Sequence, residues 1–125
     1  MKRKLLMLIL ISTFLLTCTG SAFASGYSYG SNLETFSTFV QGKSNTSWWG
    51  YYPWTGGAVY SNLSVYSGGW VVEDSSNVSD YGTDGVVQGI THGFDRGYWY
   101  KVNGAHTGSF ISGAIYTESA QKQCP

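Results

Sequence analysis

Short runs of β-branched and aromatic residues, broken by Gly, Asn, Asp or Ser every eight to twelve residues, extend through most of this chain. Long stretches with a helical period are missing. Val, Ile, Thr, Tyr, Phe and Trp fit the pleated surface of a strand, and the small residues that interrupt them allow turns. The pattern therefore predicts an all-β fold, a small antiparallel β-sandwich or partly open barrel of about seven to eight short strands.

Eight segments match the strand pattern: 35–41, 47–52, 58–66, 70–73, 85–91, 97–102, 105–111 and 114–117. The strongest turn signal is Asn103-Gly104, because both residues accept the positive φ of a type I′ turn. It predicts a hairpin at that point. Residues 25–32 are expected to be a flexible leader or an edge strand, and residues 119–125 a polar tail.

The N-terminal segment has the pattern of a bacterial signal peptide. A basic start at 2–4 precedes an apolar run at 5–16, which is shorter than the roughly 20 residues of a membrane-spanning helix. Small residues at Ala22 and Ala24 occupy the positions that a signal peptidase reads. We therefore expect cleavage after Ala24, a secreted protein and no transmembrane segment.

Lipid anchoring is the alternative for this segment. Residues 15–18 resemble a bacterial lipobox that would place a lipid on Cys18, but Thr17 stands where Gly, Ala or Ser is preferred. Secretion is favoured because its cleavage pattern is complete. The expected organisation is a signal peptide (1–24), a single β domain (25–118) and the polar tail (119–125).

Charge excludes two classes of function. After cleavage at Ala24, four basic residues would face seven acidic ones, and the chain would have no Lys/Arg cluster. A nucleic-acid binder that acts by charge is excluded, and a cationic lipid-disrupting peptide is disfavoured. With 17% aromatic and 11% charged residues, intrinsic disorder is excluded as well.

Cys124 would be the only cysteine of the secreted chain. An intramolecular disulfide is then impossible, so the domain must be held together by packing. We expect Cys124 to lie exposed on the tail, where it either joins two copies in a disulfide homodimer or stays unpaired.

Segment 48–54 is the main candidate for binding, with five aromatics in seven positions. Alternation along a strand places Trp48 and Tyr52 on one face and Trp49 and Tyr51 on the other. One interpretation is a core strand with a tyrosine-rich surface. The other is a stacking platform for sugar rings, whose ligand-binding residues would be Trp48, Trp49, Tyr51, Tyr52 and Trp54.

The segment Tyr98-Trp99-Tyr100 alternates in the same way. Tyr98, Tyr100 and Val102 are predicted to point inward, whereas Trp99 packs beneath the stem of Lys101 or lies open.

Signals for metal binding are weak. Residues 80–85 resemble a calcium loop, but the third position is Gly82 and Thr91 stands where a bidentate Glu is required. His92 and His106 are too few for a zinc site. We predict no metal and no cofactor.

Signals for catalysis are weak too. A glycosidase would require carboxylates such as Glu34, Glu73 and Glu118 to converge. We predict no catalytic residues and no enzymatic activity.

Three functions remain. The first is a secreted β-rich module that binds a polysaccharide or cell-wall polymer through exposed aromatics. The second is a secreted, bacteriocin-like antagonist that acts on a surface target of competing bacteria. The third is a structural protein of the envelope or matrix that associates through aromatics and sheet edges.

Overall fold

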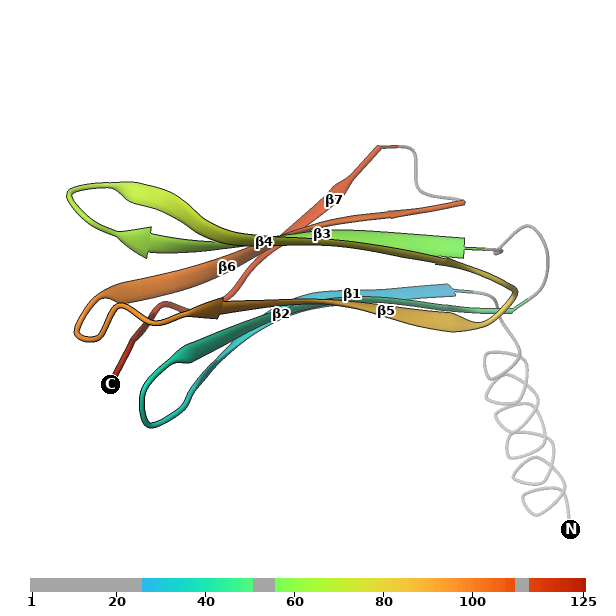
Figure 1. Ribbon diagram of the computed structural model, residues 1–125. Helices are drawn as coiled ribbons and strands as arrows, with labels where there is room; N and C mark the ends of the chain where they lie inside the picture. Colours follow the sequence, from blue (N-terminus) through green and yellow to red (C-terminus); the bar gives the residue numbers. More distant parts are fainter. Residues whose placement is uncertain (1–25, 51–55, 110–112) are drawn as a thin grey trace, which may run out of the picture.

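The computed structural model describes residues 26–50, 56–109 and 113–125. In these ranges all regular structure is β-strand, arranged as two antiparallel sheets, so the all-β prediction is confirmed (Figure 1). The strands are β1 (Gly26–Thr35), β2 (Val40–Trp49), β3 (Gly56–Tyr66), β4 (Trp70–Tyr81), β5 (Gly85–Gly93), β6 (Trp99–Gly108), β7 (Ile115–Glu118) and β8 (Lys122–Gln123). None of the described residues belongs to a helix long and apolar enough to cross a membrane. The expected signal peptide lies outside the described residues.

The two sheets lie one above the other (Figure 1). Sheet A has the strand order β1-β2-β5, and sheet B has the order β4-β3-β6-β7, with β8 paired to β6. The turn between β4 and β5 crosses from sheet B to sheet A at one end of the molecule, and the loop between β5 and β6 crosses back at the other (Figure 1). One face of each sheet is therefore turned toward the other sheet, and the opposite face toward solvent.

Two apolar clusters fill the space between the sheets. The larger consists of Leu33, Val40, Leu63, Val65, Tyr100, Val102 and Cys124, all almost fully buried. The smaller is built around Trp48, which packs with Val59 and Val87. Tyr100 and Val102 point inward as alternation predicts, whereas Tyr98 precedes β6 and is 48% exposed.

The predicted hairpin at Asn103-Gly104 is wrong, because β6 continues through both residues. Asn103 pairs with Asn62 of β3 in the middle of sheet B. Gly104 faces the interior, where a Cβ atom would lie 2.8 Å from side-chain atoms of Ser31, Ser44 and His106. The glycine is thus required by close packing between the sheets and not by a turn.

The strand boundaries also differ near the two ends. Residues 26–35 form a full edge strand of sheet A, which agrees with the edge-strand alternative. The predicted strand at 35–41 is interrupted by a turn in which the Phe36 N–H donates to the Phe39 carbonyl, 2.8 Å away. This turn lets the chain reverse between β1 and β2.

Cys124 is not on an exposed tail. Strand β8 pairs with β6, the Cys124 N–H donates to the Tyr98 carbonyl at 2.9 Å, and the Gly97 N–H donates to the Cys124 carbonyl at 2.8 Å. These bonds bring Cys124 into the larger apolar cluster at 1% exposure, and burial raises the pKa of its thiol. The disulfide homodimer stays a prediction that requires Cys124 to leave the core.

We expect the buried thiol to react slowly. In a Cys18→Ser chain, where Cys124 is the only cysteine, an aromatic disulfide reagent should modify the folded protein at least about tenfold more slowly than the unfolded chain, because the thiolate is both scarce and inaccessible. Absorbance of the released thiol measures the two rates. Equal rates would show that the thiol is open to solvent.

A methyl group added at Gly57 should destabilise the fold. An alanine Cβ at this position would lie 2.6 Å from the Trp48 ring, so we expect Gly57→Ala to lower the free energy of unfolding by about 1–3 kcal/mol. Gly30→Ala is the matched control, since Gly30 is also in a strand and has no neighbouring atom within 4 Å of the added Cβ. Urea unfolding compares the variants, and an equal effect at both positions would contradict the close packing around Trp48.

Candidate functional site

The structure separates the two tryptophans of the predicted platform. Trp48 is 1% exposed, and its indole N–H donates to the Gly82 carbonyl at 2.8 Å. It therefore offers no surface to a ligand. Trp49 is 42% exposed on the outer face of sheet A. Tyr51, Tyr52 and Trp54 lie outside the described residues.

A different group of aromatic side chains lies on the outer face of sheet B. Trp70 of β4 pairs in register with Tyr66 of β3. Val65 of β3 pairs with Tyr100 of β6. The next residues along the two strands are Tyr66 and Trp99, which therefore lie beside each other on the opposite face. Three adjacent strands thus present three large rings side by side, and we call Trp70, Tyr66 and Trp99 the aromatic row.

The aromatic row borders an open hollow of about 310 Å³ that is completed by Gln121. Tyr66 is 49% exposed and Trp99 is 47% exposed. The Tyr66 and Trp70 rings meet edge to face with their centroids 5.3 Å apart. Such a contact holds each ring in place while one ring face stays accessible, so the hollow has rigid aromatic walls and a primary amide at its rim.

Lys101 supports the row from the next position along β6. Its ammonium group lies 4.6 Å from the centroid of the Trp70 ring and 3.5 Å from a carboxylate oxygen of Glu118. The first contact is a cation–π interaction, and the second neutralises the lysine. Trp99 was expected either beneath the stem of Lys101 or open to solvent. It is open, because Lys101 reaches across to Trp70 of β4.

Part of the aromatic row could be found from the sequence. Alternation in Tyr98-Trp99-Tyr100 identifies Trp99 as the outward residue. Tyr66 and Trp70 carried a usable signal that was missed: they flank the short turn 67–69, and residues on either side of a tight hairpin turn face each other across the strands. The meeting of this hairpin with Trp99 depends on the strand order and has no local signal.

A buried network of hydroxyl groups and one histidine lies between the two apolar clusters. His106 is fully buried, with Nδ1 2.8 Å from Thr46 Oγ1 and Nε2 2.6 Å from Thr117 Oγ1. The chain of hydrogen bonds continues from Thr117 to Ser31 at 2.6 Å, and from Ser31 to Ser44 at 2.8 Å. These side chains come from β1, β2, β6 and β7, so the network ties both sheets together.

The donor and acceptor of each hydrogen bond to His106 follow from the role of Thr46. Thr46 donates its hydroxyl to the Ala58 carbonyl at 3.1 Å, so it must accept from His106 Nδ1–H. Nε2 is then unprotonated and accepts from Thr117. Burial lowers the pKa of His106, with a hydrogen bond to the backbone of Asn45 acting in the opposite direction. A neutral imidazole with no access to solvent acts here as a structural connector.

The carboxylates considered for a glycosidase do not converge. Glu34 pairs with Lys43 at 3.9 Å, and Glu118 pairs with Lys101. Glu73 interacts instead with the Tyr100 hydroxyl and with Asp95; burial raises its pKa, and the charges of Asp95 and Asp74 raise it further. These three glutamates are therefore not arranged around one substrate position.

The acidic residues of the calcium-like segment bond to backbone amides. Asp80 Oδ1 accepts from Tyr81 N–H at 2.8 Å, and Asp84 Oδ1 accepts from Gly50 N–H at 3.0 Å. In the part of the chain that the structure describes, no three His, Cys, Asp or Glu side chains are placed to share a metal ion. Comparison with models of known protein families and with curated proteins found no match.

Protonation of His106 should weaken the fold. The folded pKa lies below the unfolded value of 6.5, so the unfolded chain binds more protons in the interval between the two values. We expect the free energy of unfolding to fall as the pH is lowered from about 7.5 to about 5.5, measured by urea unfolding.

His106→Gln and His92→Gln separate this effect from other groups. The raised pKa of Glu73 acts in the opposite sense, since acid favours its folded, protonated form, and it is unchanged in either variant. The pH dependence should be reduced or reversed in His106→Gln and retained in His92→Gln. The same profile for wild type and His106→Gln would refute a structural role for the neutral imidazole.

Proposed function

We propose that this protein is a secreted β-rich module that binds a glycan or cell-wall polymer, and that the aromatic row Trp70, Tyr66 and Trp99 is its binding surface. The observation that carries the proposal is the position of three large, partly exposed rings on three adjacent strands, beside a hollow with an amide at its rim. A pyranose ring has an apolar C–H face and polar hydroxyl edges. It therefore matches an aromatic surface bordered by hydrogen-bonding groups.

The rigidity of the row favours this use. Strand positions fix the spacing of the rings, and the contacts between Tyr66, Trp70 and Lys101 limit their rotation before any ligand arrives. Little side-chain entropy is then lost on binding, so less of the free energy of stacking is offset by the ordering of the rings.

Charge supports a neutral ligand. Lys101, the basic group beside the row, is already paired with Glu118, and β3 contains no charged residue. Affinity would come from stacking and hydrogen bonds. The secreted location, which rests on the expected signal peptide, would bring the protein to extracellular polymers.

Removing one ring of the row should weaken retention on the polymer. We expect the wild type to be retained on at least one of cellulose, xylan, chitin or peptidoglycan in a sedimentation assay, and Trp99→Ala to bind that polymer about tenfold or more weakly. Circular dichroism checks that the variant is folded.

Trp49→Ala is the matched control, because Trp49 has nearly the same exposure as Trp99 but lies on the other sheet. Its retention should equal that of the wild type. Loss of retention in Trp49→Ala alone would move the site to the platform predicted from segment 48–54. No retention of the wild type on any of the four polymers would overturn the proposal, and growth inhibition of related bacteria by the same protein would favour the antagonist class.

A further inference from the structure

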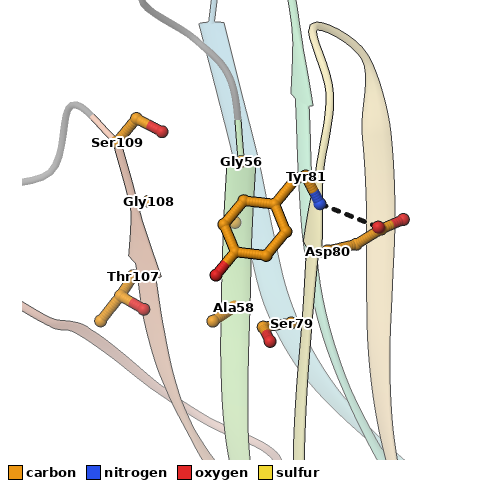
Figure 2. Close-up of a pocket in the computed structure, with 9 residues that line it drawn as sticks. Gly56, Ala58, Ser79, Asp80, Tyr81, Thr107, Gly108 and Ser109 are labelled. Carbon is orange, nitrogen blue, oxygen red and sulfur yellow. Dashed lines mark hydrogen bonds between the residues drawn. The ribbon is translucent and has the colours of Figure 1, made fainter.

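A second hollow lies at the opposite end of sheet B, where β3 begins (Figure 2). It measures about 220 Å³ and is lined by segments of β3, β4 and β6. Its floor is formed by small residues, among them Gly56 and Ala58, and hydroxyl groups of Ser79 and Thr107 stand around it (Figure 2). The hollow exists because the residues that line this end of the sheet are small, whereas those at the other end are large aromatics.

Tyr81 lies across this hollow with its ring over β3 (Figure 2). An added Cβ at Gly56 would be 3.4 Å from Cδ1 of Tyr81, so the ring lies beside the glycine at the start of β3. The side chain is nevertheless 85% exposed. The Tyr81 N–H donates a hydrogen bond to Asp80 Oδ1 at 2.8 Å, which Figure 2 shows. Most of the ring is thus open to stack on a flat ligand.

The two hollows open on the same face of sheet B and are connected by uncharged side chains. Alternation from Tyr66 brings Asn62, Tyr60 and Ala58 to the outer face of β3. Tyr60 is 44% exposed, and Asn62 Oδ1 accepts a hydrogen bond from Ser75 Oγ at 2.8 Å. Tyr66 and Ala58 are eight residues apart, which corresponds to about 26 Å along a strand.

We propose that this face binds one extended, neutral glycan chain at two subsites, the aromatic row at one end of β3 and the Tyr81 hollow at the other. The inference rests on the proposed glycan-binding function and adds the class of ligand: a linear polymer that runs along β3, not a terminal sugar. Both ends offer an exposed aromatic ring beside hydrogen-bonding groups, and the strip between them offers a phenol, amides and hydroxyls. A chain of sugar rings repeats this alternation of apolar faces and polar edges.

The chemistry of the face favours a glycan over a protein partner. A protein interface usually has a contiguous apolar centre, whereas here the strip between the two hollows mixes the Tyr60 phenol with the hydrogen-bonded pair Asn62 and Ser75. Lys101, the basic group beside the aromatic row, is paired with Glu118, so it does not steer an anionic polymer to this face.

Dependence on ligand length tests the inference. The probes are soluble β-1,4-linked glucose and N-acetylglucosamine oligomers from disaccharide to octasaccharide, titrated calorimetrically into the full chain. We expect affinity to rise with length until both subsites are covered. Tyr81→Ala should lower affinity for the octasaccharide about tenfold and leave disaccharide affinity unchanged, whereas Trp99→Ala lowers both.

Tyr81→Phe and Val86→Ala are the controls. The first keeps the stacking ring and should retain most of the octasaccharide affinity. The second truncates an exposed apolar residue of sheet A and should change nothing. Octasaccharide affinity that is unaffected by Tyr81→Ala, while Trp99→Ala still weakens binding, would overturn the second subsite and leave the proposed function standing. Absence of wild-type binding to every oligomer and every polymer would overturn both.

Discussion

The close approach of sheets A and B determines which side chains the interior can hold. At several inward positions only glycine fits, because a large side chain from another strand occupies the space. Trp48 shows the principle: its ring lies against Gly57 of the opposite sheet and Gly85 of the neighbouring strand, and a Cβ at either position would overlap it. A fully buried tryptophan is thereby accommodated without separating the sheets. Dense packing of this kind can stabilise a domain of this size when no disulfide is present among its described residues.

The short distance between the two sheets also places polar groups in the middle of the core. Ser44, Thr46 and Ser61 face inward on central strands, where only small side chains can be placed opposite Gly104 and Gly89. Their hydroxyl groups must find hydrogen-bond partners inside the protein, since water does not reach them: Ser61 donates to Ser44, and Thr46 bonds to the Ala58 carbonyl and to His106. His106 connects this group to Thr117 of β7, a strand of only four residues that would otherwise be held by few contacts. The network therefore positions the edge strand that carries Glu118, the partner of Lys101.

Sequence reasoning identified the strands with clear alternation and failed where tertiary packing overrides a local preference. The strand predicted at 58–66 nearly matches the observed β3. Alternation around Trp99 gave the correct faces for Trp99, Tyr100 and Val102 but not for Tyr98, which precedes β6 and is exposed. Asn103-Gly104 has the strongest local turn preference in the chain, yet it lies inside β6, because the position needs a residue without a side chain more than it needs a turn. Cys124 was expected in solvent because its neighbours are polar; its burial depends on pairing between β8 and β6, which no local pattern reveals.

The aromatic row depends on a further feature that sequence patterns do not show, a β-bulge in β4. Leu63 pairs with Asp74 and Ser64 pairs with Val72, so Glu73 is an extra residue in the strand. A shift of one residue reverses which face each following side chain occupies. Without the bulge, the outward positions of Ser75 and Asn77 would continue to Glu73 and Val71, and Trp70 would point toward sheet A. The extra residue turns Trp70 outward, beside Tyr66.

The bulge is held by the core on its other side. The Glu73 carboxylate accepts a hydrogen bond from the Tyr100 hydroxyl, which itself accepts from Asp95 N–H at 2.9 Å, and burial raises the pKa of Tyr100. Tyr100 is in turn fixed by its fully buried ring, which packs over Gly93 of sheet A. Gly93 of sheet A thus makes room for the Tyr100 ring, and the Tyr100 hydroxyl holds Glu73, the bulge residue that orients Trp70 in sheet B. Close packing between the sheets and the arrangement of the aromatic row on the outer face are, in this protein, consequences of the same constraint.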